Sequence, residues 1–349
     1  MIQVNRIYLI FNRLVTKKFL VDTSDNCIKT NNMATDINQY LSESIETHKM
    51  KHIQKEVDAF QAKADEVKSK LETHYGCNLY YVFRSGSFAK NTAINIKFDI
   101  DLVAPFKYES FDTLEAMYND VYDFLVNEYK DGTYIRKQKV SIGLTFPIDK
   151  NGVIVKLDVV PGRELNKDDY PNTKNLNLYF NEDHWGYKKG SRQKTNIHAQ
   201  IDHISGKSEE RKVIRLLKIW KNTNHQDYKS FMLELFTIKA MASYSGDNNL
   251  WDKLKYVMTY IADNVTDESF RLIDPGNSNN NVLSSIDMNK RSMLSTTMRT
   301  IINAIDNDSN SVAIYFPINA KYQKQENRYG YKSGSSGPSY PPTSQRFGE

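Results

Sequence analysis

The chain has 349 residues, of which 40% are hydrophobic and 26% are charged. That is enough for a packed core and for about two domains or one bilobed unit, and it excludes a disordered tail or a small disulfide-stapled scaffold. Lysine and arginine number 47 against 42 aspartates and glutamates, a net charge of +5, so the chain is not expected to coat a long nucleic acid. Its two cysteines, Cys27 and Cys77, form neither a disulfide framework nor a cysteine-rich zinc site, and fit a reducing, cytoplasmic setting.

Both ends of the chain are expected to lie outside the fold. The segment 2–20 is apolar, but basic residues interrupt it and a small-residue cleavage site is lacking, so it is interpreted as neither a signal peptide nor a membrane span. Residues 1–32 are either an extension from a mis-assigned start or an appended arm, because the first strongly periodic element follows Met33. Residues 321–349, rich toward their end in Gly, Ser, Pro and Tyr, are expected to be a flexible tail.

A first lobe of mixed α and β structure is predicted over residues 33–165. Helical spacing of apolar residues and short apolar runs bounded by turn residues distinguish its helices from its strands. The predicted elements are a long helix at 37–75, strands at 78–84, 98–106, 134–146 and 152–160, and a helix at 112–129 that opens with the capping-box pair Asp112 and Glu115.

The pattern then changes to that of a mostly helical second lobe, assigned to residues 166–320. A loop-rich stretch over 161–206 comes first. Beyond it, Leu, Ile, Met, Phe and Trp recur at helical spacing and predict helices at 208–222, 229–244, 250–264 and 289–307. The predicted fold class is therefore α+β, with two lobes.

Two acidic residues lie side by side on the strand predicted at 98–106. Asp99 and Asp101 are two residues apart, so they point to the same face of the strand, while the apolar residues between and around them bury the other face. Carboxylates held this close repel each other unless a cation lies between them. The pair is either solvated on an outer face or a set of ligands for hard cations.

Two further features become informative when they are considered together with this pair. Asp158 is the one acid in the apolar run 153–160, where it is either a structural ion-pair or capping residue or a third carboxylate of the same site. Gly86-Ser87 follows a predicted strand, where a tight turn can present backbone N–H groups and a hydroxyl to a phosphate chain. Gly-Ser turns and isolated aspartates are each common, but their combination at these offsets is far rarer.

In combination these residues resemble the polymerase β-type nucleotidyltransferase superfamily. The matching runs are Gly86-Ser87-Phe88-Ala89-Lys90-Asn91-Thr92-Ala93-Ile94, Asp99-Ile100-Asp101-Leu102 and Leu157-Asp158-Val159-Val160-Pro161. Within that superfamily the chain is similar to the bacterial cyclic-oligonucleotide synthases (CD-NTases), relatives of cyclic GMP-AMP synthase and oligoadenylate synthase. The resemblance runs from about Met33 to Phe316 and includes segments 216–221, 229–234 and 273–282.

The resemblance implies a bilobed fold in which a long N-terminal spine helix braces a mixed-sheet catalytic lobe and a helical lobe. It also implies roles for individual site residues: Gly86 and Ser87 contact the donor triphosphate, Asp99, Asp101 and Asp158 bind two Mg²⁺ ions for which Mn²⁺ can substitute, Lys218 reaches the triphosphate with Ser230 hydrogen-bonding to it, and Phe231 offers a face to a base.

The activity implied by the resemblance is the joining of nucleoside triphosphates, ATP and GTP being expected, into a cyclic di- or oligonucleotide second messenger with release of pyrophosphate. The messenger would act on a separate effector in anti-phage (CBASS-type) signalling. A ubiquitin-transfer-like partner acting on the C-terminal tail is a further hypothesis from the resemblance. The His/Cys zinc module with which animal cyclic GMP-AMP synthase grips DNA has no counterpart in this chain, so long DNA is not an expected partner.

Two alternatives stay open at the level of sequence. One is a different enzyme on the same catalytic lobe, such as a terminal adenylyltransferase acting on RNA, a linear oligonucleotide synthase or a transferase for a small acceptor. The other is a non-catalytic nucleotide-binding module. The presence of Gly86-Ser87 together with all three aspartates argues against the second, because a decayed site is expected to lose at least one of them.

Overall fold

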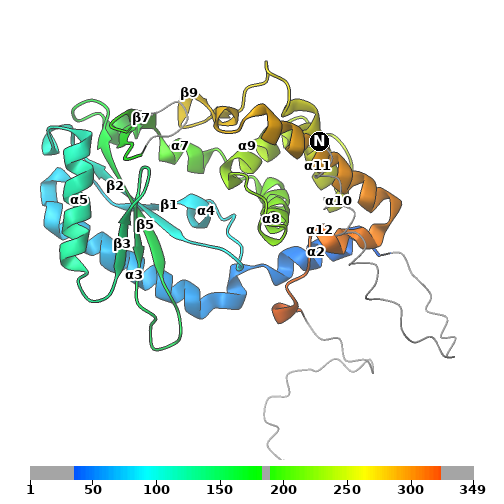
Figure 1. The fold of residues 1–349 in the computed structure, drawn as a ribbon, viewed down its shortest axis with the longest axis horizontal. Helices are drawn as coiled ribbons and strands as arrows, with labels where there is room; N and C mark the ends of the chain where they lie inside the picture. Colours follow the sequence, from blue (N-terminus) through cyan, green and yellow to red (C-terminus); the bar gives the residue numbers. More distant parts are fainter. Residues whose placement is uncertain (1–34, 183–188, 324–349) are drawn as a thin grey trace, which may run out of the picture. The chain divides into compact units, whose positions relative to one another are not determined.

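Residues 35–182 and 189–323 are described in the computed structural model, and they combine a mixed β-sheet with a set of packed helices (Figure 1). The sheet and the helices have separate hydrophobic cores. The predicted α+β class, with a sheet lobe and a mostly helical lobe, is therefore confirmed. The predicted extension at 1–32, with Cys27, and the tail from residue 324 onward lie outside the described residues.

The larger sheet of the described residues has seven strands in the order β1-β2-β5-β4-β3, with β6 beside β5 and β7 beside β6. β2 and β5 run parallel, and the other neighbouring pairs are antiparallel. The bounds are β1 (Phe83–Ser85), β2 (Ile100–Phe106), β3 (Tyr134–Lys137), β4 (Ile142–Thr145), β5 (Lys156–Glu164), β6 (Leu176–Tyr179) and β7 (Arg192–Thr195). A smaller sheet pairs β8 (Ile273–Asp274) with β9 (Asn277–Asn281).

Alternation along β2 separates the two faces of the sheet. Ile100, Leu102 and the next two alternate residues of β2 lie at 0% exposure in one core with α3 (Gln54–Tyr75) and α5 (Leu114–Glu128). Asp101 falls between them, so its side chain points to the opposite face, which α3 and α5 leave uncovered. The sheet thus buries one face under two helices and keeps its acidic face available for a site.

The long helix predicted at the start of the fold is in fact two helices, α2 (Ile37–Thr47) and α3, joined by a 3-10 turn, η1 (Met50–Ile53). Side chains close the last turn of α2: His48 Nδ1 lies 2.8 Å from the Ser44 carbonyl oxygen, a group that would otherwise need a further helical turn as partner. α2 packs into the helical core and α3 into the sheet core. The pair still braces both lobes, as the resemblance implies.

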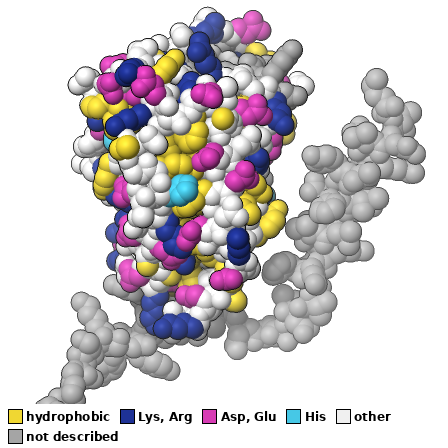
Figure 2. Space-filling view, turned by 90° about the vertical axis from the view of Figure 1, so that its left-hand side faces the viewer, with side chains coloured by type: hydrophobic (Ala, Val, Ile, Leu, Met, Phe, Trp, Pro, Cys, Tyr) yellow, Lys and Arg dark blue, Asp and Glu magenta, His cyan; other side chains and the backbone are white. Residues whose placement is uncertain are grey.

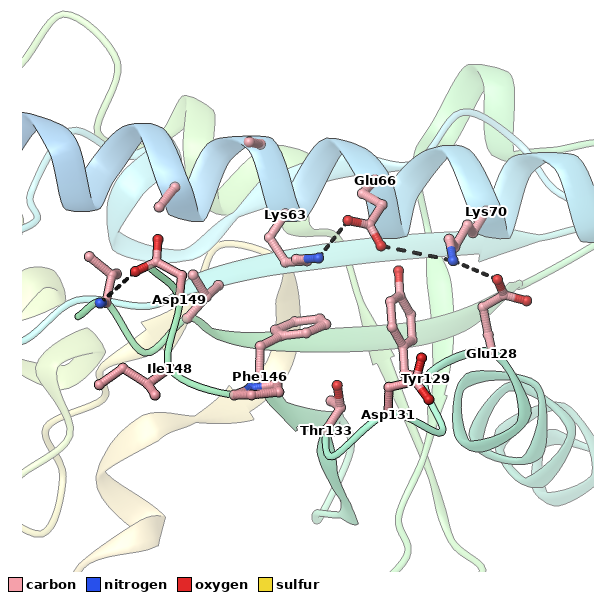
Figure 3. Close-up of a pocket in the computed structure, with 15 residues that line it drawn as sticks. Lys63, Glu66, Lys70, Glu128, Tyr129, Asp131, Thr133, Phe146, Ile148 and Asp149 are labelled. Carbon is pink, nitrogen blue, oxygen red and sulfur yellow. Dashed lines mark hydrogen bonds and ion pairs between the residues drawn. The ribbon is translucent and has the colours of Figure 1, made fainter. Parts of the chain in front are cut away.

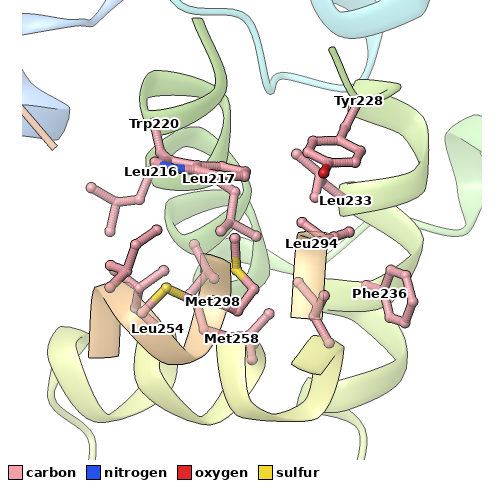
Figure 4. Packing of buried hydrophobic residues seen from close by; sticks show 14 of the residues in the cluster. Leu216, Leu217, Trp220, Tyr228, Leu233, Phe236, Leu254, Met258, Leu294 and Met298 are labelled. Carbon is pink, nitrogen blue, oxygen red and sulfur yellow. The ribbon is translucent and has the colours of Figure 1, made fainter. Parts of the chain in front are cut away.

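The helical lobe is held together by apolar side chains from four long helices and α2. Figure 4 shows Leu216, Trp220, Leu254, Met258 and Met298 converging in this core, where all five are 1% exposed or less. Burying each such side chain contributes about 1.5–3 kcal/mol. The long helices are α8 (Ser208–Thr223), α9 (Ser230–Met241), α10 (Leu250–Asn264) and α11 (Met288–Asn307), each within a few residues of its predicted range.

The stretch 161–206 is not the loop that its low apolar content predicts. It contains the end of β5, the strands β6 and β7, and short helices between and after them, so it continues the larger sheet beyond residue 165. Two other details differ: the strand predicted at 134–146 is a β3–β4 hairpin, and Thr113 rather than Asp112 caps α5, accepting from the Ala116 amide at 3.0 Å. The short helices are α4 (Gly86–Ala89), α6 (Tyr170–Thr173), α7 (Ile197–Asp202) and α12 (Val312–Tyr315).

Candidate functional site

Three of the predicted site residues come together on the uncovered face of the sheet. Asp101 on β2 is the register partner of Asp158 on the parallel strand β5, and of Ser85 on β1. Residues that are partners in neighbouring strands point to the same face, so the two carboxylates are neighbours. Asp99 lies two residues before Asp101, just ahead of β2, and is exposed. The structure therefore brings the carboxylate pair and the third acid to one place.

The charges in this cluster oppose one another. Burial raises the pKa of Asp101 to about 7, and the negative charges of Asp99 and Asp158 contribute to the same rise. Burial and the charge of Asp99 also raise the pKa of Asp158, against a hydrogen bond from Gln138 that lowers it. Among the described residues, burial and neighbouring charges act on the Asp101 carboxylate, and no hydrogen bond to it does. A cation bound at the cluster would relieve the repulsion.

The Gly86-Ser87 turn lies directly against Asp101. Gly86 has φ +68°, and a Cβ placed on it would be 1.8 Å from Asp101 Oδ2. Glycine is therefore required at this position for two reasons: the backbone is left-handed, and there is no room for a side chain. The turn is closed by its own backbone, since the Thr92 amide donates to the Ser87 carbonyl oxygen at 2.9 Å. This close approach is what a phosphate-contacting turn next to a carboxylate site needs.

Two further residues of the site were missed from the sequence. Gln138, in the turn of the β3–β4 hairpin, donates from Nε2 to Asp158 Oδ1 at 2.9 Å. Gly143 on β4 is the register partner of Asp158, and a Cβ there would be 2.2 Å from Gln138 Nε2. A glycine inside an apolar strand is the signal that could have found this contact, because it marks a place where another group approaches the backbone closely.

The donor chemistry of the cluster suits a hard divalent cation, since carboxylate oxygens are the ligands that Mg²⁺ prefers. Its geometry is not a closed ligand cage. In residues 35–182 and 189–323, no group of three or more His, Cys, Asp or Glu side chains stands in an arrangement that could hold a metal ion. Asp99, Asp101 and Asp158 thus offer the charge and the oxygen atoms for a metal, and would have to draw together around one.

A cavity of about 720 Å³ opens beside Asp99 and Asp158. Its wall includes the basic residues Lys97, Arg136 and Lys156, together with Gln138 and Gly143 of the hairpin. Basic side chains beside a carboxylate cluster can receive a polyphosphate while the carboxylates hold its counter-ions.

Lys218 of α8 is buried, and its ammonium is directed to the chain segment after the Gly-Ser turn. Nζ donates to the Thr92 carbonyl oxygen at 2.9 Å. Burial lowers the pKa of Lys218 to about 8, while the negative charges of Glu234 and Asp99 raise it in opposition. Ser230 instead receives a hydrogen bond from Lys221, one turn further along α8, at 3.4 Å.

Phe231 lies beside a buried ion pair that joins the two lobes. Lys90, which follows α4, donates to Glu234 of α9 at 2.7 Å, and both side chains are less than a tenth exposed. The Lys90 ammonium also lies 4.4 Å from the centre of the Phe231 ring. Phe231 further lines a second cavity, of about 400 Å³, whose wall combines Val160 of the sheet with Asn280 and neighbouring residues of the helical lobe. Its ring is therefore placed where a planar ligand could meet it.

A third cavity, of about 630 Å³, lies under α3 and contains none of the candidate residues (Figure 3). Four of its charged groups are already paired: Lys63 with Glu66 at 2.6 Å, and Lys70 with Glu128 at 2.5 Å. The face of the molecule in Figure 2 likewise shows lysines and arginines interspersed with acids over its described residues. Neither feature concentrates charge of one sign as the carboxylate cluster does.

Comparison with known proteins identifies the fold. No family model and no curated protein sequence matches the chain. The structure is similar to that of CdnC of E. coli determined with ATP, with a TM-score of 0.62 and 20% identity over 84% of this chain and 99% of that one. It is also similar to CdnE of Elizabethkingia meningoseptica, a cyclic dinucleotide synthase (TM-score 0.51, 12% identity, 69% and 90% covered), and to DncV of Vibrio cholerae, a cyclic AMP-GMP synthase (TM-score 0.51, 15% identity, 82% and 87% covered).

The chain has the fold of these three proteins. The resemblance drawn from the sequence motifs is thereby confirmed at the level of fold, over most of each matched chain. Among the described residues, none of the helices has the length and apolar character required to cross a membrane.

Proposed function

We propose that the protein is a nucleotidyltransferase that joins nucleoside triphosphates, with ATP and GTP as expected substrates, into a cyclic di- or oligonucleotide and releases pyrophosphate. One observation carries the proposal: a Gly-Ser turn that tolerates no side chain lies against Asp101, with Asp158 as its register partner. Nucleotidyl transfer needs a turn for the triphosphate and carboxylates for its cations at one place. The likeness in fold to two cyclic dinucleotide synthases supports the cyclic product.

In this proposal Asp99, Asp101 and Asp158 hold two Mg²⁺ ions, for which Mn²⁺ can substitute. When bound, the ions would supply charge neutralisation at the reacting phosphate and a lowered pKa of the attacking hydroxyl. Gln138 donates to Oδ1 of Asp158 at 2.9 Å and would hold this carboxylate in place for a cation. The ribose hydroxyl of one nucleotide forms a bond to the α-phosphorus of another as the bond to pyrophosphate breaks.

The remaining candidate residues bind and orient the substrates. Gly86 permits the phosphate chain to approach the backbone, and Ser87 donates to it from its amide and hydroxyl. Phe231 offers its ring to a base, and Ser230 hydrogen-bonds to the triphosphate. Lys218 could reach the triphosphate only by exchanging its present contact with Thr92.

The wider role is proposed on the same fold likeness. The product would be a messenger that acts on a separate effector in CBASS-type anti-phage signalling. A ubiquitin-transfer-like partner would act on the tail, and the location would be cytoplasmic. The division into an extension at 1–32, a catalytic lobe at 33–165, a helical lobe at 166–320 and a tail at 321–349 also remains a proposal. β6 and β7, which belong to the larger sheet, fall within the helical-lobe range of that division.

Product analysis tests the proposal. Purified protein is incubated with ATP, GTP, CTP and UTP and either Mg²⁺ or Mn²⁺, treated with phosphatase and analysed by mass spectrometry. The variant Asp99→Ala/Asp101→Ala removes two of the carboxylates, and Asp112→Ala/Asp131→Ala removes two exposed acids at the ends of α5 as a matched control. A phosphatase-resistant product from wild type and control, lost in the site variant, is the expected result.

Other products would point elsewhere. Linear oligonucleotides or extended RNA would replace the cyclic reaction by RNA tailing or linear synthesis on the same catalytic lobe. Binding of nucleotide without any product under either metal would favour a nucleotide-binding module instead.

A further inference from the structure

One face of α8 contacts three successive residues of the chain just after the Gly-Ser turn. Arg211, Arg215 and Lys218 are spaced by four and three residues, so they lie on one side of the helix. Arg211 Nε donates to the carbonyl oxygen of residue 90 at 3.0 Å, Arg215 Nη2 to that of residue 91 at 2.6 Å, and Lys218 Nζ to that of residue 92 at 2.9 Å. Successive turns of the helix thus bind successive carbonyl groups.

The amides of the same three residues point back into the Gly-Ser turn. The amides of residues 90, 91 and 92 donate to the carbonyl oxygens of residues 86, 88 and 87, at 3.2, 3.1 and 2.9 Å. Segment 90–92 is therefore bonded on one side to the turn and on the other to α8. Any displacement of its carbonyls would loosen the hydrogen bonds that close the turn.

The conformation of Asn91 makes this double contact possible. Its φ is +53°, in the left-handed region that asparagine tolerates better than most residues. Its side chain adds a second acceptor for the same helix, since Arg215 Nη2 also lies 3.0 Å from Asn91 Oδ1. The Lys90 ammonium, in turn, donates a hydrogen bond to Glu234 of α9. Two helices of the helical lobe therefore hold the segment.

These contacts come from charged donors, which form stronger hydrogen bonds than neutral ones do. Arg215 and Arg211 are both partly buried, which limits competition from water. Lys212, between them in sequence, is exposed and pairs with Glu209 of its own helix instead. Lys212 therefore shows that a basic residue of α8 does not contact segment 90–92 merely because it is charged.

We propose that Arg211 and Arg215 are positioning residues that fix segment 90–92 and thereby hold Gly86-Ser87 in its turn conformation before any nucleotide binds. The helical lobe would in this way set the geometry of the turn on the sheet lobe. The inference rests on the proposed function only in taking the turn as a nucleotide contact. The conformational claim itself concerns the nucleotide-free chain.

Hydrogen–deuterium exchange of the nucleotide-free full chain tests the inference. The probes are the amides of residues 90–92, read in overlapping peptides. Arg211→Gln and Arg215→Gln are each expected to speed their exchange roughly tenfold, because each removes a charge-assisted hydrogen bond. Arg215→Lys, which keeps a charged donor, should recover part of the protection. Lys212→Gln, which removes the same charge from the same helix, is the control and should match wild type.

Unchanged exchange at residues 90–92 in both glutamine variants would overturn the inference. If those variants exchange faster throughout the chain, the Arg215→Lys variant decides. Faster amide exchange confined to residues 86–92 supports the role, and unchanged exchange at these residues refutes it. In an active enzyme, Arg215→Gln should also raise the KM for triphosphate about tenfold, with recovery toward wild type in Arg215→Lys. Because exchange needs no nucleotide, an inactive protein would refute the proposed function without deciding this inference.

Discussion

Replacing Asp101 by asparagine should stabilise the protein while removing its activity. In the absence of metal, burial and the charges of Asp99 and Asp158 hold the pKa of Asp101 at about 7 against an ordinary value of 3.8. Ionising this carboxylate in the folded state therefore costs up to about 4 kcal/mol, at about 1.4 kcal/mol for each tenfold change in proton affinity. Asparagine has nearly the same shape and no charge to ionise.

The sign of the pH dependence follows from the raised pKa. Between about pH 4 and pH 7 the folded state keeps a proton on Asp101 that the unfolded state has lost, so the free energy of unfolding of wild type falls as pH rises through this range. Asp101→Asn has no carboxyl group to ionise at this position, so its free energy of unfolding does not fall in this way. The variant should match wild type near pH 4 and exceed it by up to about 4 kcal/mol at pH 8.

The assay is denaturant unfolding with EDTA at pH 4, 6 and 8. Asp131→Asn, which changes an exposed acid after α5, should differ from wild type by no more than about 0.5 kcal/mol at any of these pH values. Added Mg²⁺ should raise the midpoint of wild type and leave Asp101→Asn unmoved, because only wild type keeps the carboxylate cluster. A neutral or destabilising effect of Asp101→Asn at pH 8 would refute the idea that this carboxylate is held in an unfavourable state.

Three further substitutions test contacts around the site and the fold, with stability read by denaturant unfolding. Gly86→Ala and Gly152→Ala both force alanine into a left-handed backbone at about 1–2 kcal/mol, but only Gly86→Ala displaces the Asp101 carboxylate, so it alone should abolish pyrophosphate release. Lys90→Met leaves the Glu234 carboxylate buried without its ion pair and should cost about 3–5 kcal/mol, much of which Lys90→Met/Glu234→Leu should restore. Thr113→Ala should lose about 1 kcal/mol with the cap of α5, and a smaller loss than a few tenths would contradict that role.

The parts of the site that the sequence predicts are those encoded by local spacing. Asp99 and Asp101 share a face because a strand has a two-residue period, and Gly86-Ser87 marks its turn by composition. The register of Asp101 with Asp158 joins strands more than fifty residues apart, and the family resemblance rather than periodicity pointed to it. The long helices of the second lobe followed from strong apolar periodicity.

What the sequence does not predict depends on contacts made only in the folded chain. The turn that holds Gln138 lies inside a continuous predicted strand, so the β3–β4 hairpin and its hydrogen bond to Asp158 were hidden. Helix α2 ends before α3 without a proline or glycine to mark the end; instead, the His48 side chain contacts the Ser44 carbonyl oxygen in its last turn. β7 reads Arg-Gln-Lys-Thr, and only its pairing with β6 makes it a strand. The contact of Lys218 with Thr92 likewise depends on packing between lobes.

Pyrophosphate release reports directly on the reaction proposed for the carboxylate cluster. Wild type, Asp158→Asn and the exposed-acid control Asp131→Asn are incubated with ATP and GTP in Mg²⁺ or Mn²⁺, and pyrophosphate is quantified over time. Wild type and control should release pyrophosphate, and Asp158→Asn should release it at least about a hundredfold more slowly, because one of the carboxylates that would hold the cations is gone. Release by Asp158→Asn at the wild-type rate would contradict the assignment of these carboxylates to nucleotidyl transfer.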